Sequence, residues 1–409
     1  MKSFSILALS ATAAAHTVFT TFYVDGTSFG DGNGVRMRHD PATASAPVGP
    51  EDQNLACGFD GETGNPRVAS VRDGATLSFE FRHHADDRSK LSIAQSHKGP
   101  CAVYLKKVDS AIADNNAAGD GWFKIWEEGY DEDEQMWCTT KLGGEGIAGP
   151  YDQTLSVALP KGLQGGYYLA RPELLALHAA PDHDPQFYTG CAQIFLESDG
   201  DKVPKSTVSI PGYVKSDDES VTFNLYEQPM KLPYKTPGPA LAELVGSGGS
   251  SSSSGGGNNN SGSDSKGSSG NEPTVDTSKE TPETTAPVSK CAAAFKRRAQ
   301  MTQTEGLEPD NCILSYAGFC ATESPDYSDE AGCWDSGEDC WKQNEACWDH
   351  ARNLPIGGNP WCKLLGEKCE AMNAACKARN FNGPENKGAV LTPAAATLEI
   401  VYPKGAVAS

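Results

Sequence analysis

The sequence lacks three features that would point to common classes of protein. After its first fifteen residues it has no apolar run approaching the ~18 residues that cross a bilayer, so we expect a soluble mature chain without membrane contact. Positive charge is scarce: the formal net charge is −20, which argues against nucleic acid or an anionic membrane surface as a partner. None of the thirteen cysteines has the CxxC spacing of a structural zinc site.

An export signal opens the chain. Lys2 is followed by an apolar stretch at residues 4–9 and by three alanines that end at Ala15, which predicts a signal peptide over residues 1–15 and cleavage before His16. We therefore expect a secreted, extracellular protein whose cysteines form disulfides. An N-terminal histidine offers a metal ion both its free α-amine and its imidazole, which no internal histidine can do.

Composition divides the rest of the chain into two modules. Residues 246–287 consist mostly of Gly, Ser, Asn and Thr, a composition typical of a flexible tether. The expected organisation is a first domain at residues 16–232, a linker at 233–290, a Cys-rich module at 291–380 and a C-terminal tail at 381–409.

Short strands separated by turn-forming residues dominate the first domain. Residues 75–81 alternate Leu77, Phe79 and Phe81 toward one face. The same style recurs at residues 102–108, 167–170, 192–196 and 221–226. The pattern favours a mainly β fold, an immunoglobulin- or fibronectin-like antiparallel β-sandwich. Four cysteines of this domain could close two disulfides: Cys57, Cys101, Cys138 and Cys191.

The cysteines of the second module recur every seven residues. One triplet is Cys333, Cys340 and Cys347, and the other is Cys362, Cys369 and Cys376. Seven residues return to nearly the same face of an α-helix, so each triplet forms a stripe, and the Pro- and Gly-containing residues 355–360 separate two antiparallel helices. Antiparallel register pairs Cys333 with Cys376, Cys340 with Cys369 and Cys347 with Cys362. Cys291, Cys312 and Cys320 remain, one of them without an obvious partner.

Four motifs of the first domain together resemble a known family. They are His-Thr-Val-Phe from His16, SHKGP at residues 96–100 before a VYL strand, ALH at 176–178 and QFYTGCAQI at 186–194. In this order they are similar to fungal lytic polysaccharide monooxygenases of auxiliary activity family nine. The resemblance covers essentially all of residues 16–232, and the second module resembles no family that we recognise.

The resemblance implies a single type 2 copper ion. Its ligands would be the α-amine and ring of His16 and the ring of His97, which lies in a turn before a strand, with the phenol of Tyr188 at a long axial position. Three nitrogens in a planar T suit Cu(II) and tolerate Cu(I).

Further roles follow from the same resemblance. Gln186 would hydrogen-bond Tyr188, and because the two are two residues apart on an expected strand, both side chains leave from one face. His178 would donate a proton to the activated oxygen or orient it, with His183 as a competitor for this role, and Tyr213 would be an exposed ring that stacks on sugars. We expect His39, His83, His84 and His350 to be solvated or loop residues and assign no chemistry to them. A disulfide common in the family corresponds to Cys57 with Cys191, which leaves Cys101 with Cys138.

The reaction implied is oxidative cleavage of a β-1,4-linked polysaccharide, with cellulose as the expected substrate. Hydrogen would be abstracted at C1 or C4 with O2 or H2O2 and an external electron donor, either a small reductant or a redox enzyme. Such chemistry does not use the carboxylate pair of a glycoside hydrolase. The expected partners are therefore a crystalline or soluble β-glucan and the electron donor, and the protein is expected to be a monomer. The alternative function is a secreted, non-catalytic copper-binding protein with the same nitrogen donors.

Three tryptophans of the second module leave two interpretations open. Trp334, Trp341 and Trp348 each follow a stripe cysteine and are spaced about 10 Å apart by helical rise, close to one disaccharide repeat of a β-1,4-glucan. They could therefore stack on alternate sugars. We favour the other interpretation, that they pack against residues 291–327 and supply the core that so small a module lacks. A third possibility is that the module binds a protein partner.

Overall fold

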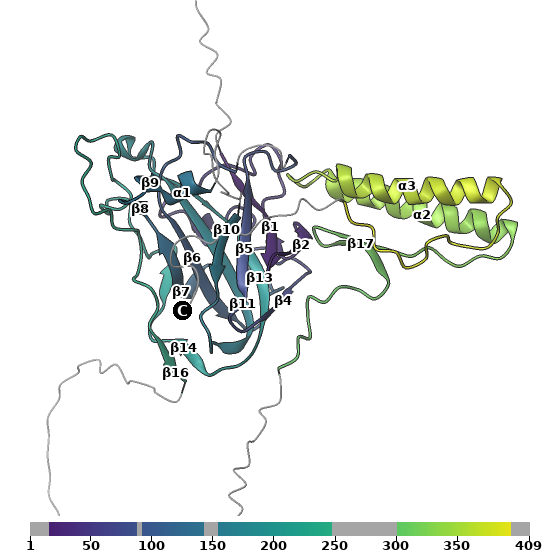
Figure 1. The fold of residues 1–409 in the computed structure, drawn as a ribbon, viewed down its shortest axis with the longest axis horizontal. Helices are drawn as coiled ribbons and strands as arrows, with labels where there is room; N and C mark the ends of the chain where they lie inside the picture. The colour runs from purple at the N-terminus through teal and green to yellow at the C-terminus, as the bar shows by residue number, and fades with distance from the viewer. Residues whose placement is uncertain (1–15, 88–91, 143–153, 248–300, 394–409) are drawn as a thin grey trace, which may run out of the picture.

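Two β-sheets packed face to face form the larger part of the molecule (Figure 1). The structure is a computed structural model that describes residues 16–87, 92–142, 154–247 and 301–393. Within these ranges the smaller sheet has the order β10 (Thr154–Ala158), β5 (Thr76–Arg82), β1 (Val18–Val24) and β2 (Thr27–Asp31). The larger sheet runs β15 (Val208–Ile210), β7 (Gly119–Glu128), β6 (Cys101–Val108), β11 (Gln164–Ala176), β13 (Cys191–Asp199) and β3 (Val35–Arg36), with β12 (Gln186–Thr189) on β11 and β4 (Ala69–Arg72) parallel to β13.

The core lies between the two sheets. As expected, Leu77, Phe79 and Phe81 of β5 are fully buried, and they belong to the same apolar cluster as Val103 and Leu105 of β6. A second cluster covers the opposite face of the larger sheet, where Tyr104 and Trp122 pack under the loops that follow β15. The chain is therefore a mainly β sandwich with both faces of the larger sheet buried.

The segment expected as a strand at residues 221–226 is irregular instead. Its backbone bonds locally: the amides of Val221 and Thr222 donate to the carbonyl of Asp218, and the amide of Tyr226 donates to the side chain of Asn224. Turn hydrogen bonds of this kind compete with the ladder of a sheet. The chain also stays on the sandwich beyond residue 232, because β16 (Leu244–Gly246) pairs with β14 (Lys202–Pro204). The remaining small pair is β8 (Tyr130–Asp131) with β9 (Met136–Trp137).

Two long helices and a β-hairpin follow in the C-terminal part. The hairpin consists of β17 (Cys312–Tyr316) and β18 (Phe319–Thr322), and the helices are α2 (Glu330–Ala351) and α3 (Asn359–Lys377). Three disulfides join the helices in the pairs expected from the seven-residue spacing, Cys333–Cys376, Cys340–Cys369 and Cys347–Cys362. Cys312 pairs with Cys320, and Cys291 lies outside the described residues. Gly337 of α2 faces α3 closely: an added Cβ would lie 2.8 Å from the side chain of Asn373.

Among the tryptophans of α2, Trp348 packs against this core, but the other two do not supply it. Trp334 is 40% exposed and Trp341 37% exposed, and Trp348 is half-buried. The interpretation that all three rings are packed is therefore wrong. The apolar residues that fill the space between the helices and the hairpin are instead Leu314, Tyr316, Trp361, Leu365 and Met372. A helix of this composition does not indicate from sequence which of its faces will meet the sandwich.

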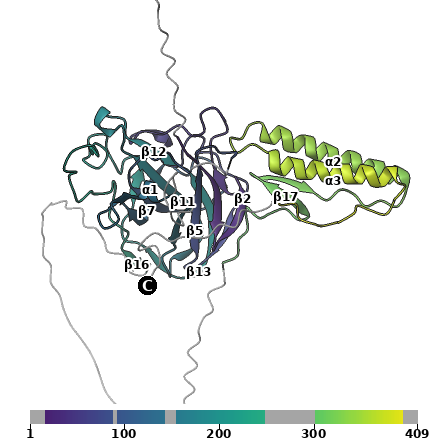
Figure 2. The ribbon, with the colours of Figure 1, turned by 45° about the horizontal axis from the view of Figure 1, so that its top comes forward.

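The helices are docked on the sandwich and project from the side where β1 and β2 lie (Figures 1 and 2). The backbone amide of Ala317 donates to the carbonyl of Asp31 at 2.9 Å, and that of Gly318 donates to Asn33 at 2.8 Å. A Cβ on Gly32 would lie 2.7 Å from Ala317 and 2.8 Å from Ile356. This close fit places the turn between α2 and α3 against the sandwich.

The segment that precedes the hairpin also adheres to the sandwich. Gln303 donates to the carbonyl of Val68, and the carboxylate of Glu305 accepts from the hydroxyl of Ser110 and the amide of Ala111. Part of the expected C-terminal tail contacts the module, because Leu391 donates its amide to the carbonyl of Ile313. No helix among the described residues is long and apolar enough to cross a membrane.

Candidate metal centre

Five side chains expected at a copper site come from four segments that meet at one end of the sandwich. His16 precedes β1, His97 lies in the turn before β6, His178 follows β11, and Gln186 and Tyr188 are on β12. The ring centroids of His16 and His97 are 6.3 Å apart, and the Tyr188 ring lies 6.1 Å from the first and 5.9 Å from the second. The two imidazoles and the phenol therefore surround one small volume.

The turn that carries His97 is held by close backbone packing. Gly99 admits no side chain, because a Cβ would lie 1.8 Å from the carbonyl oxygen of Leu175. The backbone amide of Gly99 donates a hydrogen bond to the hydroxyl oxygen of Thr139 in α1 (Cys138–Lys141) at 2.9 Å. The disulfide Cys101–Cys138 joins the start of β6 to the same helix. Two neighbouring anchors thus fix where the His97 ring points.

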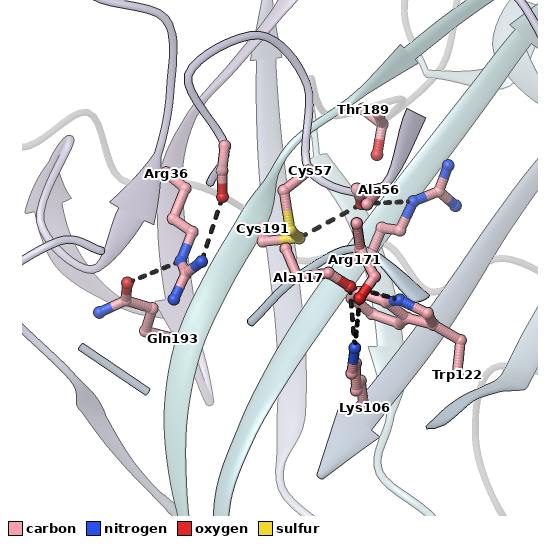
Figure 3. The surroundings of a disulfide bond; sticks show 12 residues. Arg36, Ala56, Cys57, Lys106, Ala117, Trp122, Arg171, Thr189, Cys191 and Gln193 are labelled. Atoms are coloured by element: carbon pink, nitrogen blue, oxygen red, sulfur yellow. Dashed lines mark hydrogen bonds between the residues drawn. A yellow bond between two sulfur atoms is a disulfide. The ribbon is translucent and has the colours of Figure 1, made fainter. Parts of the chain in front are cut away.

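A second disulfide positions β12. Cys191, two residues after the end of β12, pairs with Cys57. Figure 3 shows this disulfide beside Ala56, whose carbonyl accepts a hydrogen bond from the guanidinium of Arg171 at 2.8 Å. Arg171 is fully buried and also bonds Glu173. The Cys57–Cys191 disulfide implied by the family resemblance is confirmed, and so is Cys101–Cys138, the pair that remained by elimination.

A chain of hydrogen bonds runs from Tyr188 to the surface. The Tyr188 hydroxyl donates to Oε1 of Gln186 at 2.8 Å, and the Gln186 amide donates to Asp184 at 3.0 Å. Burial, with a smaller contribution from Asp184, raises the pKa of Tyr188 well above its usual value. The phenol therefore stays protonated and donates its proton to Gln186.

His97 has the properties of a neutral metal ligand, because one of its ring nitrogens makes no hydrogen bond within the described residues. Its Nδ1 lies 3.1 Å from the hydroxyl of Ser96, whereas its buried Nε2 has no hydrogen-bond partner in the described part of the chain. Burial, followed by the nearby His178 and His16, lowers the pKa of His97 to about 3. A buried, unpartnered and unprotonated imidazole nitrogen facing a second histidine fits a copper ion.

His178 is the imidazole that lies beside this pair. Its ring centroid is 4.1 Å from that of His97, and burial lowers its pKa. Its Nδ1 is buried without a hydrogen-bond partner within the ranges that the structure describes. His183, the competitor, is exposed. The structure therefore brings His178, and not His183, to the candidate centre.

Tyr213 is not an exposed ring in this chain. Its hydroxyl donates to buried Glu173, and its ring packs edge-on against Tyr104 at 5.6 Å. Tyr213 is therefore half-buried instead of exposed as expected, and its role in binding sugars stays a prediction. Tyr226, which the sequence did not single out, is 60% exposed and donates its hydroxyl to the carbonyl of His178 at 3.2 Å. Tyr226 is thus an exposed aromatic residue beside the candidate centre.

Two of the histidines given no chemistry lie in contact with each other near the centre. His83 and His84 follow β5, with ring centroids 4.6 Å apart. Burial lowers the pKa of His83, and the nearby His84 and His16 lower it further. His83 is therefore a neighbour of the candidate centre rather than a solvated loop residue.

In the described parts of the chain, no three His, Cys, Asp or Glu side chains form a group that could hold a metal ion. The expected signal peptide lies outside these parts.

Comparison with known proteins identifies the family. Auxiliary Activity family 9 (formerly GH61) matches residues 16–234. The chain is 45% identical over 397 residues to AA9 family lytic polysaccharide monooxygenase C of Aspergillus tamarii, covering 96% of this chain and 93% of that protein. It is 42% identical over 398 residues to AA9 family lytic polysaccharide monooxygenase A of Emericella nidulans, covering 96% of this chain and 61% of that protein. The solved structure CvAA9A is 29% identical, with a TM-score of 0.48, over 55% of this chain and 97% of its own.

The chain therefore belongs to Auxiliary Activity family 9. Members of this family are copper-dependent lytic polysaccharide monooxygenases, which cleave polysaccharides oxidatively with an external reductant, and the fungal members are secreted. Both relatives align over 96% of this chain, so the similarity includes the helical module as well as the sandwich.

Proposed function

We propose that this protein is a secreted monooxygenase that cleaves β-1,4-linked polysaccharide, with cellulose as its substrate, by hydrogen abstraction at C1 or C4. The observation that carries the proposal is the buried, unpartnered Nε2 of His97 beside the rings of His16 and Tyr188. Cleavage of a signal peptide before His16 would complete the donor set with a free α-amine. Copper bound there would supply the one-electron chemistry that activates O2 or H2O2, with electrons from an external donor.

The chain's own residues would bind and orient the reactants. His16 and His97 would hold the metal through three nitrogens, and the Tyr188 phenol would be the oxygen ligand beside them. Gln186 is held by hydrogen bonds to Asp184 and Tyr188. The imidazole of His178 would then be the group that donates a proton near the metal. Exposed Tyr226 would stack on a sugar ring of the substrate surface.

The alternative is a copper-binding protein without turnover. It would need the ligands His16 and His97 but neither an ordered Gln186 and Tyr188 pair nor an exposed aromatic next to His178. The presence of both features favours catalysis.

The decisive experiment uses the secreted full chain. We expect N-terminal sequencing to begin at His16, calorimetry to show one copper ion per chain, and mass spectrometry to detect oxidised cello-oligosaccharides only with copper and reductant. His97→Ala should abolish both copper binding and products. His39→Ala removes an exposed histidine elsewhere on the surface and should change neither. Stoichiometric copper without oxidised products would favour the non-catalytic alternative, and copper retained by His97→Ala would refute the ligand assignment.

A further inference from the structure

Two tryptophan rings of α2 are exposed on a surface for which the copper chemistry has no use. Trp334 and Trp341 are 40% and 37% exposed, although burying such rings would be strongly favourable. Both follow a cysteine that is fully or almost fully buried, Cys333 and Cys340, so the disulfide face of α2 lies against α3 and the tryptophans lie on an adjoining face. We call exposed Trp334 and Trp341, continued by Trp348, which is half-buried and packs partly against the core, the tryptophan row.

The geometry of the row is set by the helix. Residues seven apart lie within about 20° of the same direction and about 10 Å apart along the axis. Three disulfides to α3 cross-link α2 along its length. The spacing of the rings is therefore fixed, unlike that of aromatic residues on a loop, and it is close to the repeat of two β-1,4-linked sugars.

Carboxylates lie between the rings. Glu338 and Glu345 each come four residues after a tryptophan, one turn along the same face, and both are exposed. Glu338 also pairs with Lys342 at 2.8 Å. A charge at every other turn of the row is unsuited to an apolar partner helix, and the acidic surroundings repel an anionic polymer or membrane. Carboxylates accept hydrogen bonds from hydroxyl groups, and the C–H face of a pyranose stacks on an aromatic ring.

We propose that the tryptophan row binds a neutral β-1,4-linked glycan chain, one ring for each disaccharide, with Glu338 and Glu345 accepting hydrogen bonds from sugar hydroxyls. Because Ile356 of the turn between α2 and α3 and Ala317 of the hairpin both pack on Gly32, the row is a rigid extension of the sandwich and not a module on a free tether. The proposal shares its substrate class with the proposed function but does not depend on copper.

Retention on insoluble cellulose tests this proposal. The full chain is incubated with cellulose without reductant, and the dissociation constant is measured for wild type, Trp341→Ala and Trp334→Ala/Trp341→Ala. We expect each lost ring to weaken binding roughly 3- to 10-fold. Trp341→Tyr keeps a ring and should restore most of the binding. Leu241→Ala removes an apolar side chain of the sandwich that is even more exposed, at 53%, and should leave binding unchanged.

Each outcome distinguishes between the possible occupants of the row. Unchanged affinity in the double variant would overturn the proposal, as would sedimentation showing that the rings instead join two copies of the chain. Ring-dependent retention without oxidised products would leave this proposal standing and refute the proposed function. Oxidised products with ring-independent retention would do the reverse.

Discussion

Individual residues of the candidate centre are tuned mainly by burial. Burial keeps the His97 imidazole neutral and the Tyr188 phenol protonated, so both present an uncharged donor atom to a metal at ordinary pH. Gln186 is held from two sides, because its amide group both accepts from Tyr188 and donates to Asp184. The orientation of these groups is therefore set before any metal binds.

Replacing Tyr188 with phenylalanine tests this residue-scale arrangement. The ring should remain packed, since Tyr188 is 2% exposed, but Gln186 would lose its donor and the centre would lose the phenol oxygen proposed as a ligand. We expect the rate of oxidised-product formation to fall roughly 10- to 100-fold, with a changed Cu(II) electron paramagnetic resonance spectrum. Tyr168→Phe removes a buried hydroxyl that donates to Gln164 and should alter neither. A Tyr188→Phe enzyme with the wild-type rate and spectrum would contradict the role as a ligand.

Sequence motifs identified the residues of the centre, but not every residue around it. His16, His97, His178, Gln186 and Tyr188 lie in motifs that the family resemblance carries, and the structure brings them together. Tyr226 had no such signal, because its position depends on a loop whose turns bond locally and show no periodicity. The exposure of Tyr213 was predicted wrongly, because only the fold shows that its hydroxyl bonds Glu173 and its ring packs against Tyr104.

At the scale of elements, the last turn of α2 makes a contact that titrates. Nε2 of His350 donates to the carbonyl of Ala317 at 3.1 Å, and the His350 ring stacks on Phe319 at 5.8 Å. Burial lowers the pKa of His350 below its ordinary value of 6.5, an effect that the hydrogen bond to Ala317 opposes and nearby His39 reinforces. This contact joins α2 to the turn of the β17–β18 hairpin.

The docked helices should therefore loosen in mild acid. Below about pH 6.5 the unfolded chain protonates this imidazole while the folded chain does not, so stability present above pH 6.5 is lost as the pH falls toward the lower folded pKa. We expect hydrogen exchange at residues 312–322 to accelerate, after correction for intrinsic rates, between pH 7.5 and pH 5. His350→Gln retains a donor without titrating and should show a smaller change. Equal changes in both proteins would assign the acid sensitivity to other groups.

The helices were predictable because a seven-residue cysteine period has one simple interpretation, and the disulfide pairs followed from it. The exposure of the tryptophans was not, since a helix with charges on several faces does not reveal which face is covered. Strand positions with alternating apolar residues, such as β5, were also found.

At the scale of the whole molecule, the sandwich and the helical part form one body. Gly306 is central to this joint: it has φ +68°, its carbonyl accepts from the amide of Val68, and an added Cβ would lie 2.2 Å from the Val68 side chain. The sequence could not reveal this docking. A stretch rich in Gly and Ser predicts a tether, but it carries no information on whether the residues after it are anchored by contacts such as those of Gln303 and Glu305.

Gly306→Ala should weaken the joint between the two parts. We expect a lower melting temperature and faster hydrogen exchange at residues 301–311, with copper binding unchanged. Gly388→Ala provides the matched control, because Gly388 has φ +75° and no atom within 4 Å of an added Cβ. It therefore incurs the same left-handed backbone cost, roughly 1–2 kcal/mol, without the collision. Equal destabilisation by both substitutions would show that the contact with Val68 contributes little.

The segments on either side of residues 248–300 are both bound to the sandwich, which determines what a cut of the chain between them would do. The six disulfides described all close within either the sandwich or the helical part, so among these residues no covalent cross-link joins the two. A single peptide-bond cut between residues 248 and 300 would nevertheless yield two fragments that remain associated as a nicked complex. Such a complex would separate only on denaturation. Cleavage by an extracellular protease would therefore leave the helical part bound to the sandwich.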